Sequence, residues 1–227
     1  MFKTETHLHT APVSNCGRLS PEEMIDQYHE VGYTTVFISD HFANHHFNLL
    51  GDGLSWEQKS DMLYNAYLKA KAHGEKYGMH VLFSPELSLQ GNHFLLYGVD
   101  KAFLNLRDDI FDMSLKDFYH HAKAYGITII QAHPYRDGVC TPQVEFIDGI
   151  EAINSNPRHE NFDTQCFELA AKYQLPMSAG SDAHRYEDVA GAAMVSQEPI
   201  TSAEQYVSLL KEGKLQLMRH GEIVSLD

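Results

Sequence analysis

The sequence predicts one α/β domain built on a largely parallel sheet, and two observations lead to this expectation. Stretches rich in β-branched residues alternate with stretches of helical periodicity along all 227 residues. The length is enough to bury a single core, and a compact barrel of strands and helices fits into a chain of this size. We therefore expect one domain over residues 1–227, since the sequence has no linker, repeat or low-complexity segment.

The predicted strands are short and apolar. Lys3–Leu8 is the first strand, and the β-branched run Thr34–Ser39 is the second. A turn at Gln90-Gly91-Asn92 is expected to separate strands at Val81–Ser84 and Phe94–Val99. The remaining strands are predicted at Ile127–Gln131, Gly149–Ile153 and Met177–Ala179.

The predicted helices begin at capping residues. Ser20-Pro21-Glu22-Glu23 offers Ser as N-cap, Pro at the first helical position and Glu23 to close a capping box, and this helix should run to Gly32. The pair Thr201-x-x-Glu204 marks another helix start. Further helices are predicted at Ser55–Tyr77, Ser114–Tyr125, Glu160–Tyr173 and Ser202–Lys211, whereas Phe42–Leu54 is expected to be a loop.

Charge and composition argue against several classes of protein. Lys and Arg number 17 and Asp and Glu number 31, which gives a formal charge of −14. Long nucleic acids and anionic membranes bind basic surfaces, so neither is an expected partner. No apolar run approaches the roughly 18 residues of a membrane span, and no signal-peptide core is seen. The odd set Cys16, Cys140 and Cys166 contains no CxxC pair, so we expect no disulfide framework or cysteine zinc site, and a cytoplasmic setting.

Histidine is in excess, at 15 of 227 residues, and the position of the histidines is more informative than their number. The first strand ends in His7-Leu8-His9, where alternation points both imidazoles to one side. In α/β folds the chemistry gathers where strands end. The other predicted strand ends carry Asp40, His41, Glu86, His93, His133, Asp182 and His184.

These side chains are all metal ligands, and His with Asp or Glu suits zinc, manganese or iron rather than calcium. A single histidine near a strand is more often a hydrogen-bonded core residue, and one HxH pair is weak evidence. Six histidines together with Glu86 and Asp182 at successive strand ends are different, because packing them together without a metal would carry large desolvation costs. The sequence therefore predicts a metal centre.

At this point the sequence resembles the PHP (polymerase and histidinol phosphatase) superfamily of metal-dependent phosphoesterases. The motifs that carry the resemblance occur in the family's order and span residues 5 to 184. They are Glu5-Thr6-His7-Leu8-His9-Thr10, Ser39-Asp40-His41, Pro85-Glu86, Asn92-His93-Phe94-Leu95-Leu96-Tyr97-Gly98, Ala132-His133-Pro134-Tyr135-Arg136 and Gly180-Ser181-Asp182-Ala183-His184.

The resemblance implies a distorted (β/α)7 barrel, as a single PHP domain, with two to three divalent ions that are Zn, Mn or Fe. The first ion would be held by His7, His9, Glu86 and Asp182. Glu86 would bridge to a second ion held by His93 and His133. A third ion would be held by His41 and His184. Asp40 is expected either to bind metal directly or to support a ligand from behind.

The sequence departs from the family pattern between Pro12 and Arg18, where an Asp or His ligand to the third ion is usual. Asn15 could supply an amide oxygen there, and Cys16 a thiolate. His45 and His46, in the predicted loop after His41, could contact substrate or replace the missing ligand. Glu5 stands where Asp is usual, a modest change for a residue that supports the ligands.

The predicted reaction follows from the metal centre. Divalent ions lower the pKa of a bound water towards about 7 and stabilise charge on phosphate oxygens, so no Ser or Cys nucleophile is needed. The predicted catalytic residues are Glu86, Asp182 and His184, and the general acid is His184 or a metal-bound water. Arg makes bidentate contacts to phosphate, and the predicted substrate-binding residues are Arg158, Arg136 and Arg18.

The expected function is a phosphatase for a small phosphorylated substrate such as histidinol phosphate or a nucleoside monophosphate. A phosphodiesterase or nuclease acting on short nucleotides is the alternative. A non-catalytic PHP module should have lost metal ligands, which this sequence keeps. A metallohydrolase that cleaves C–N bonds is a further alternative. Such enzymes commonly bridge their metals through a modified lysine, whereas Glu86 would be the bridging residue here. Specificity would come from the loops Phe42–Leu54 and Asp137–Phe146.

Overall fold

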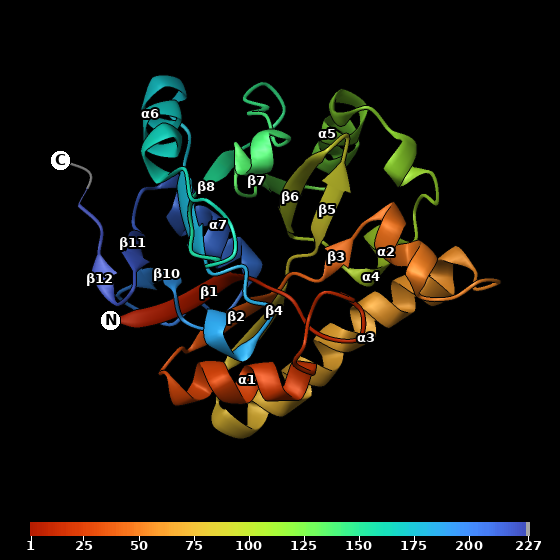
Figure 1. Cartoon of the computed structure of the whole chain (residues 1–227), viewed down its shortest axis with the longest axis horizontal. Helices are drawn as coiled ribbons and strands as arrows, with labels where there is room; N and C mark the ends of the chain where they lie inside the picture. Colours follow the sequence, from red (N-terminus) through yellow and green to blue (C-terminus); the bar gives the residue numbers. More distant parts are fainter. Residues whose placement is uncertain (226–227) are drawn as a thin grey trace.

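The computed structural model describes residues 1–225 and contains two six-stranded sheets with helices packed around them. Helices α1 (Pro21–Glu30) and α3 (Trp56–Gly74) pack together along one side, and α5 (Leu115–Ala124) and α6 (Asp163–Tyr173) lie on the other (Figure 1). The chain is thus a mixed α/β fold.

The first sheet contains the N-terminal strand β1 (Phe2–Leu8) near its centre. Strands β1, β2 (Thr35–Ile38) and β4 (His80–Phe83) pair in parallel. On the other side of β1 the pairing is antiparallel, through β10 (Ala192–Ser196), β11 (Gln216–Arg219) and β12 (Glu222–Ile223).

The second sheet has the order β3-β5-β6-β7-β8-β9. The strands in the middle of this sheet pair in antiparallel fashion, and the strands at its two edges pair in parallel. The strands are β3 (His41–Phe42), β5 (Glu86–Leu89), β6 (Asn92–Tyr97), β7 (Thr128–Gln131), β8 (Gly149–Asn154) and β9 (Met177–Gly180).

Two helix starts follow the capping signals of the sequence, whereas α7 (Ala203–Lys211) is capped by Ser202 and not by the predicted Thr201. Ser20 accepts from the backbone N–H of Glu23, and the Glu23 carboxylate accepts from that of Ser20, so the predicted capping box is present. The α3 helix begins with the same arrangement between Ser55 and Gln58. No helix within residues 1–225 is long and apolar enough to cross a membrane. The remaining helices are α2 (Asn44–Leu49) and α4 (Lys101–Leu104).

The expectation of a largely parallel sheet is wrong, because half of the strand pairings are antiparallel. The turn at Gln90 and Gly91 closes a hairpin between β5 and β6, and so short a connection joins only antiparallel strands. The described strands form two sheets linked by one parallel bridge from Leu8 to Ala183, rather than a closed (β/α)7 barrel.

Several elements were not predicted. The range Phe42–Leu54 contains β3 and α2 rather than loop alone. Strands β5, β10, β11 and β12 were also missed, since β12 is only two residues long and β10 reads Ala-Ala-Met-Val-Ser, with a single β-branched residue.

Aromatic side chains fill the space between the two sheets. Phe37 of the first sheet packs edge-on against Tyr97 of the second, with ring centroids 5.0 Å apart. Tyr206 of α7 contacts both rings, and all three side chains are fully buried or nearly so. This core fixes the separation of the sheets, and polar side chains from both sheets meet beside it.

Candidate metal centre

His7 and His9 lie side by side where β1 ends. Both are fully buried, and their Nε2 atoms are 3.0 Å apart. The Nδ1–H of His7 donates to the Glu151 carboxylate over 2.9 Å, and His9 Nδ1 lies 3.4 Å from the hydroxyl of Ser14. A ring whose Nδ1 carries a proton presents the Nε2 lone pair to a metal. Both imidazoles therefore aim their Nε2 lone pairs at one point.

Glu86 and Asp182 bring carboxylate oxygens to the same point. His7 Nε2 lies 3.3 Å from Glu86 Oε1 and 3.5 Å from Asp182 Oδ1. His9 Nε2 lies 3.8 Å from Glu86 Oε2 and 3.2 Å from Asp182 Oδ1. Ligands about 2.0–2.1 Å from a tetrahedral zinc ion are about 3.3–3.4 Å from one another. His7 and His9 thus have, with either carboxylate, distances close to those of ligands on one tetrahedral ion.

The Glu86 carboxylate also belongs to a second group of ligand atoms. Its Oε1 lies 3.1 Å from His133 Nε2 and 3.3 Å from His93 Nδ1. One carboxylate within reach of two ligand sets is the arrangement of a bridging ligand. These are the residues expected to hold the second ion, and their role as ligands stays a prediction.

A third group lies around His41, which was expected to bind a third ion together with His184. His9, His41 and His184 bring ring nitrogens within 4.8 Å of one another, and Cys16, His41 and His46 do the same with Sγ and ring nitrogens. His41 Nδ1 lies 2.6 Å from Glu86 Oε2, and His41 Nε2 lies 3.2 Å from Cys16 Sγ. His184 donates its Nδ1–H to the backbone carbonyl of Asp182 over 2.8 Å, so its Nε2 is the nitrogen available to a ligand.

The charges at this site suit a cation. Burial would raise the pKa of Glu86, but the imidazoles of His93, His7 and His41 bring it well below its usual range. Burial lowers the pKa of His133 to about 4, with a contribution from the charge of Arg136. Burial would lower the pKa values of His7 and His41, but the neighbouring carboxylates raise both, that of His41 to about 10. Because metal ligands must be ionised carboxylates and neutral imidazoles, a bound cation would have to displace the protons of these two rings. Glu86 Oε2 and His41 Nδ1 are both buried and lie 2.6 Å apart, so they pair with each other.

Cys16 differs from the other two cysteines. Burial raises the pKa of its thiol, but hydrogen bonds with His184, His41 and His46 outweigh this and bring the pKa to about 4. The Cys140 and Cys166 thiols have pKa values raised by burial, to about 11 and about 12. Only Cys16 is thus a thiolate at neutral pH.

Glu151 is a functional side chain that the sequence analysis missed. It is buried in β8, its Oε1 accepts from His7 Nδ1, and its Oε2 accepts from the backbone N–H of His133 over 3.0 Å and from Asn154 Nδ2 over 2.8 Å. It therefore orients ligands of two groups at once. The available signal was a charged residue inside the predicted strand Gly149–Ile153.

Asp40 supports the ligands from behind. Its Oδ1 accepts from the Thr10 N–H over 2.5 Å and from the Ser14 hydroxyl over 2.8 Å, and its Oδ2 accepts from the Thr10 hydroxyl over 2.6 Å. Both oxygens are thus occupied by the segment after β1, which excludes direct ligation in this arrangement. Asn15 and His45 are both exposed, and His45 belongs to none of the ligand groups among residues 1–225. A role of either residue at the third site stays a prediction.

The ligand groups open into a cavity of about 480 Å³. Of the three arginines expected to bind substrate, Arg136 lines this cavity, and it donates to Asp182 Oδ2 and to Asn154 Oδ1, over 2.5 Å each. Arg158 instead pairs with Asp188, and Arg18 has an exposed side chain, so neither is part of the cavity wall. The expectation for these two is not supported by their positions.

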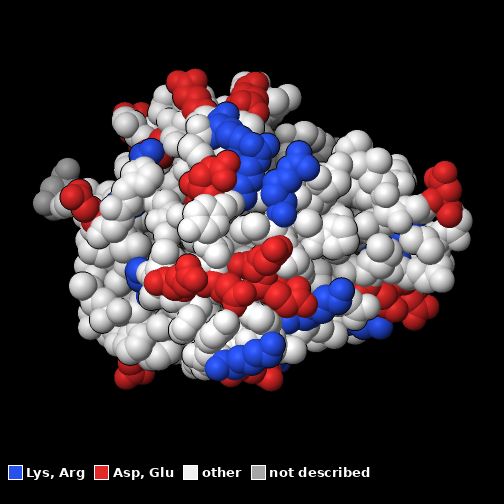
Figure 2. All heavy atoms as spheres, turned by 60° about the horizontal axis from the view of Figure 1, so that its bottom comes forward, with Lys and Arg blue, Asp and Glu red and all other residues white. Residues whose placement is uncertain are grey.

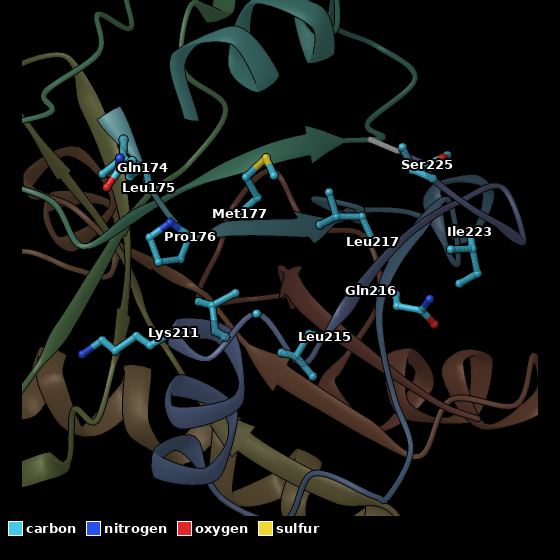
Figure 3. Close-up of a pocket in the computed structure, with 13 residues that line it drawn as sticks. Gln174, Leu175, Pro176, Met177, Lys211, Leu215, Gln216, Leu217, Ile223 and Ser225 are labelled. Carbon is cyan, nitrogen blue, oxygen red and sulfur yellow. The ribbon is translucent and has the colours of Figure 1, made fainter. Parts of the chain in front are cut away.

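A larger cavity, of about 620 Å³, lies between β9, α7 and the strands β11 and β12 (Figure 3). Its described wall is formed by residues such as Met177, Leu217 and Lys211 and contains no His, Cys, Asp or Glu. It therefore offers none of the groups that activate water or bind a metal. The smaller cavity at the ligand groups is the better candidate for chemistry.

The surface shown in Figure 2 carries acidic side chains in several groups, with smaller groups of Lys and Arg between them. This distribution agrees with the formal charge of −14. A continuous basic surface, as long nucleic acids require, is not visible on this face.

Comparison with family models and known proteins gives related but distant matches. The model of the PHP-associated family matches residues 164–215. No curated protein matches the sequence significantly.

Three solved structures share the fold. A two-domain protein from Bacteroides vulgatus, with a predicted PHP-like metal-dependent phosphoesterase, is 16% identical with a TM-score of 0.73; the match covers 99% of this chain and 66% of that one. A proposed metal-dependent phosphoesterase from Bifidobacterium adolescentis is 15% identical with a TM-score of 0.58, over 91% and 95% of the two chains. An amidohydrolase from Chromobacterium violaceum, with bound sulfate and no metal, is 18% identical with a TM-score of 0.59, over 95% and 97%.

Proposed function

We propose that the chain is a PHP-type metal-dependent phosphoesterase that hydrolyses a small phosphomonoester. The match of residues 164–215 to the PHP-associated family and the fold shared with predicted PHP-like phosphoesterases support this proposal. The enzyme would use two to three divalent ions, Zn, Mn or Fe. The single observation that carries the proposal is the geometry around Glu86. One carboxylate lies within 3.8 Å of ring nitrogens of four histidines, in two groups of ligand atoms that share it.

Bound divalent ions would lower the pKa of a water to about 7 and offset the charge of the phosphate oxygens. The chain's own residues hold the geometry. Glu86 fixes the distance between the two ligand groups, while Glu151 and Ser14 orient the rings of His7 and His9. Arg136 holds Asp182 and places a positive charge on the cavity wall, where a phosphate group would lie.

His184 is the proposed proton donor to the leaving alcohol. It lines the cavity, and its Nδ1–H is held by the carbonyl of Asp182, so the ring cannot turn away. The leaving oxygen of a phosphomonoester needs one proton when the P–O bond breaks, and a positioned imidazole can supply it.

Small substrates fit the site better than polymers. The cavity is about 480 Å³, within the range of small-molecule sites, and the acidic chain would repel a long polyanion. The fold it shares with an amidohydrolase makes C–N hydrolysis the second candidate. No lysine lies in the cavity wall among residues 1–225, so the modified lysine common in such enzymes has no counterpart.

The test is a hydrolysis screen on the metal-free protein reloaded with Zn, Mn or Fe(II). Phosphomonoesters, short phosphodiesters and cyclic amides are assayed side by side. We expect release of phosphate from monoesters with at least one metal. Preference for the diesters or the amides would instead assign the alternative reaction. Inactivity on every substrate with every metal would favour a non-catalytic PHP module.

Two variants connect the activity to the metal. Glu86→Ala and His7→Ala are expected to fold but to lose bound metal and phosphatase activity together, because each removes a ligand to the first ion. Elemental analysis and circular dichroism on the same preparations measure both. Full metal content in these variants would contradict the assignment.

A further inference from the structure

The third ligand group contains a sulfur atom that the first two lack. Cys16 lies in the tight turn after β1, where the N–H of Gly17 donates to the Ser14 carbonyl and the N–H of Arg18 donates to the His184 carbonyl, over 2.8 Å each. A Cβ on Gly17 would lie 3.0 Å from the Ser14 carbonyl oxygen, so the turn has little room to move. The position of the Cys16 side chain is thus set by the fold.

The sulfur of Cys16 faces the imidazoles of His41 and His46 and is also hydrogen-bonded with His184. Cys16 Sγ lies 3.2 Å from His41 Nε2, and the rings of His41 and His46 are 4.1 Å apart at an angle of 31°. With a zinc–sulfur distance of about 2.3 Å and a zinc–nitrogen distance of about 2.0 Å, two tetrahedral ligand atoms are about 3.5 Å apart. Cys16 and His41 would therefore need to move by only a few tenths of an ångström to bind one metal, and a ring nitrogen of His46 lies within 4.8 Å of both ligand atoms.

The orientation of the His41 and His46 rings is a second, independent reason to expect a metal here. His41 turns its Nδ1 towards the Glu86 carboxylate at 2.6 Å, the orientation in which a metal-binding histidine presents its Nε2. His46 Nδ1 is buried without a hydrogen-bond partner among residues 1–225. A buried polar atom of this kind costs free energy unless it gains a ligand.

We infer that Cys16, His41 and His46 form the third metal site, with the sulfur of Cys16 as a direct ligand. This assignment rests on the proposed function and deepens it, since it replaces the oxygen or imidazole ligand that the resemblance implies. Three protein ligands leave one position open, and Cys16 and His41 both lie in the wall of the 480 Å³ cavity. A substrate phosphate can therefore reach this ion.

A sulfur ligand also narrows the choice of metal. Thiolates favour zinc and other soft ions, whereas manganese prefers oxygen ligands. The third site should thus take zinc or cobalt in preference to manganese, while the sites around Glu86 accept all of them.

The test is a titration of the metal-free full-length protein with Co(II), followed by absorption spectroscopy. A cobalt–thiolate bond gives a charge-transfer band in the near ultraviolet that imidazole and carboxylate ligands do not give. We expect this band in the unaltered protein, its complete loss in Cys16→Ser, and a loss of one equivalent of bound cobalt per chain. His46→Gln should lose the same equivalent while it keeps the thiol.

Cys166→Ser is the matched control, because that buried thiol donates to the Pro134 carbonyl and belongs to no ligand group in residues 1–225. It should keep the band and the full cobalt content. Binding of cobalt without a charge-transfer band, or a band that survives in Cys16→Ser, would overturn the sulfur assignment and leave the Glu86 sites untouched. Absence of any cobalt binding would instead contradict the proposed function itself.

Discussion

Hydrogen-bond partners on the far side of each imidazole fix the orientation of the rings in the ligand groups. His7 is oriented by Glu151, His9 by Ser14 and His184 by the carbonyl of Asp182. Each of these contacts fixes which nitrogen faces the common point, and a metal needs that nitrogen unprotonated. At the scale of single residues, the supporting groups are therefore as important as the ligands.

Glu151→Gln tests this support. The substitution keeps the size of the side chain but weakens the acceptor for His7 Nδ1–H, so we expect about a 10–100-fold loss of metal affinity with the fold retained. Competition with a fluorescent chelator measures the affinity. Glu145→Gln is the control, because Glu145 is exposed and lies outside every ligand group among residues 1–225. Equal affinity in the two variants would refute the role of Glu151.

The three thiols should react very differently in the metal-free protein. The pKa of Cys16 is about 4, so the reactive thiolate is present throughout neutral pH, whereas the pKa values of Cys140 and Cys166 are about 11 and about 12. We expect iodoacetamide to modify Cys16 at a rate that is independent of pH between about pH 6 and pH 8. Peptide mass spectrometry identifies the site. A rate that rises tenfold per pH unit would show an ordinary thiol.

The residues expected at the metal centre could be predicted because they follow local patterns, such as the HxH of His7 and His9 at a strand end. Glu151 and His46 could not, since their importance depends on contacts across the fold. Glu151 meets His7 across 144 residues of sequence, and His46 reaches Cys16 only because a short helix replaces the expected loop. No local pattern records such contacts.

At the scale of elements, the close approach of β9 to β1 brings Asp182 beside His7. Gly180 makes this approach feasible, because a Cβ there would lie 2.6 Å from Glu151 Oε1 and 2.6 Å from His7 Cβ. The bridge from Leu8 to Ala183 continues the contact by one more step. The ends of β1 and β9 can approach each other because Gly180 and Ala183 are small.

Gly180→Ala should therefore impair both stability and metal binding. We expect a loss of about 1–3 kcal/mol in the free energy of unfolding, from overpacking, together with weaker metal binding as Glu151 and His7 move. Gly78→Ala is the control: Gly78 has φ +69° and no neighbouring atom within 4 Å of its Cβ position. It should lose about 1–2 kcal/mol from backbone strain alone and bind metal normally. Urea unfolding and metal titration separate the two cases.

The helices with capping boxes were predictable for the same reason as the HxH pair, because Ser20 and Glu23 are three residues apart and act locally. The mixed sheet was not, since the antiparallel partner of β1 is β10, which lies almost at the other end of the chain. Strand order of this kind is decided by packing between distant segments and not by the pattern of either strand.

At the scale of the whole molecule, an acidic chain concentrates buried imidazoles and carboxylates in one place between its sheets. Burying such groups costs free energy unless they are paired or bind a metal. Metal binding and folding should therefore be coupled, and a cation at this site would offset part of the excess negative charge.

Removal of metal is expected to lower the melting temperature. A ligand present at 100 times its dissociation constant stabilises the folded state by about 2.7 kcal/mol, so a chelator should reduce Tm by several degrees and added Zn should restore it. Differential scanning calorimetry measures the shift. Glu86→Gln is the control variant. Because it lacks a metal ligand, its Tm should change little when chelator or Zn is added.

The most direct measurement of the central claim is the rate of phosphate release from a phosphomonoester as a function of the equivalents of divalent metal added to metal-free protein. The account predicts no activity at zero equivalents, a rise that needs at least two equivalents per chain, and no rise in Glu86→Gln. Full activity in the metal-free protein, or an unchanged titration in Glu86→Gln, would contradict it.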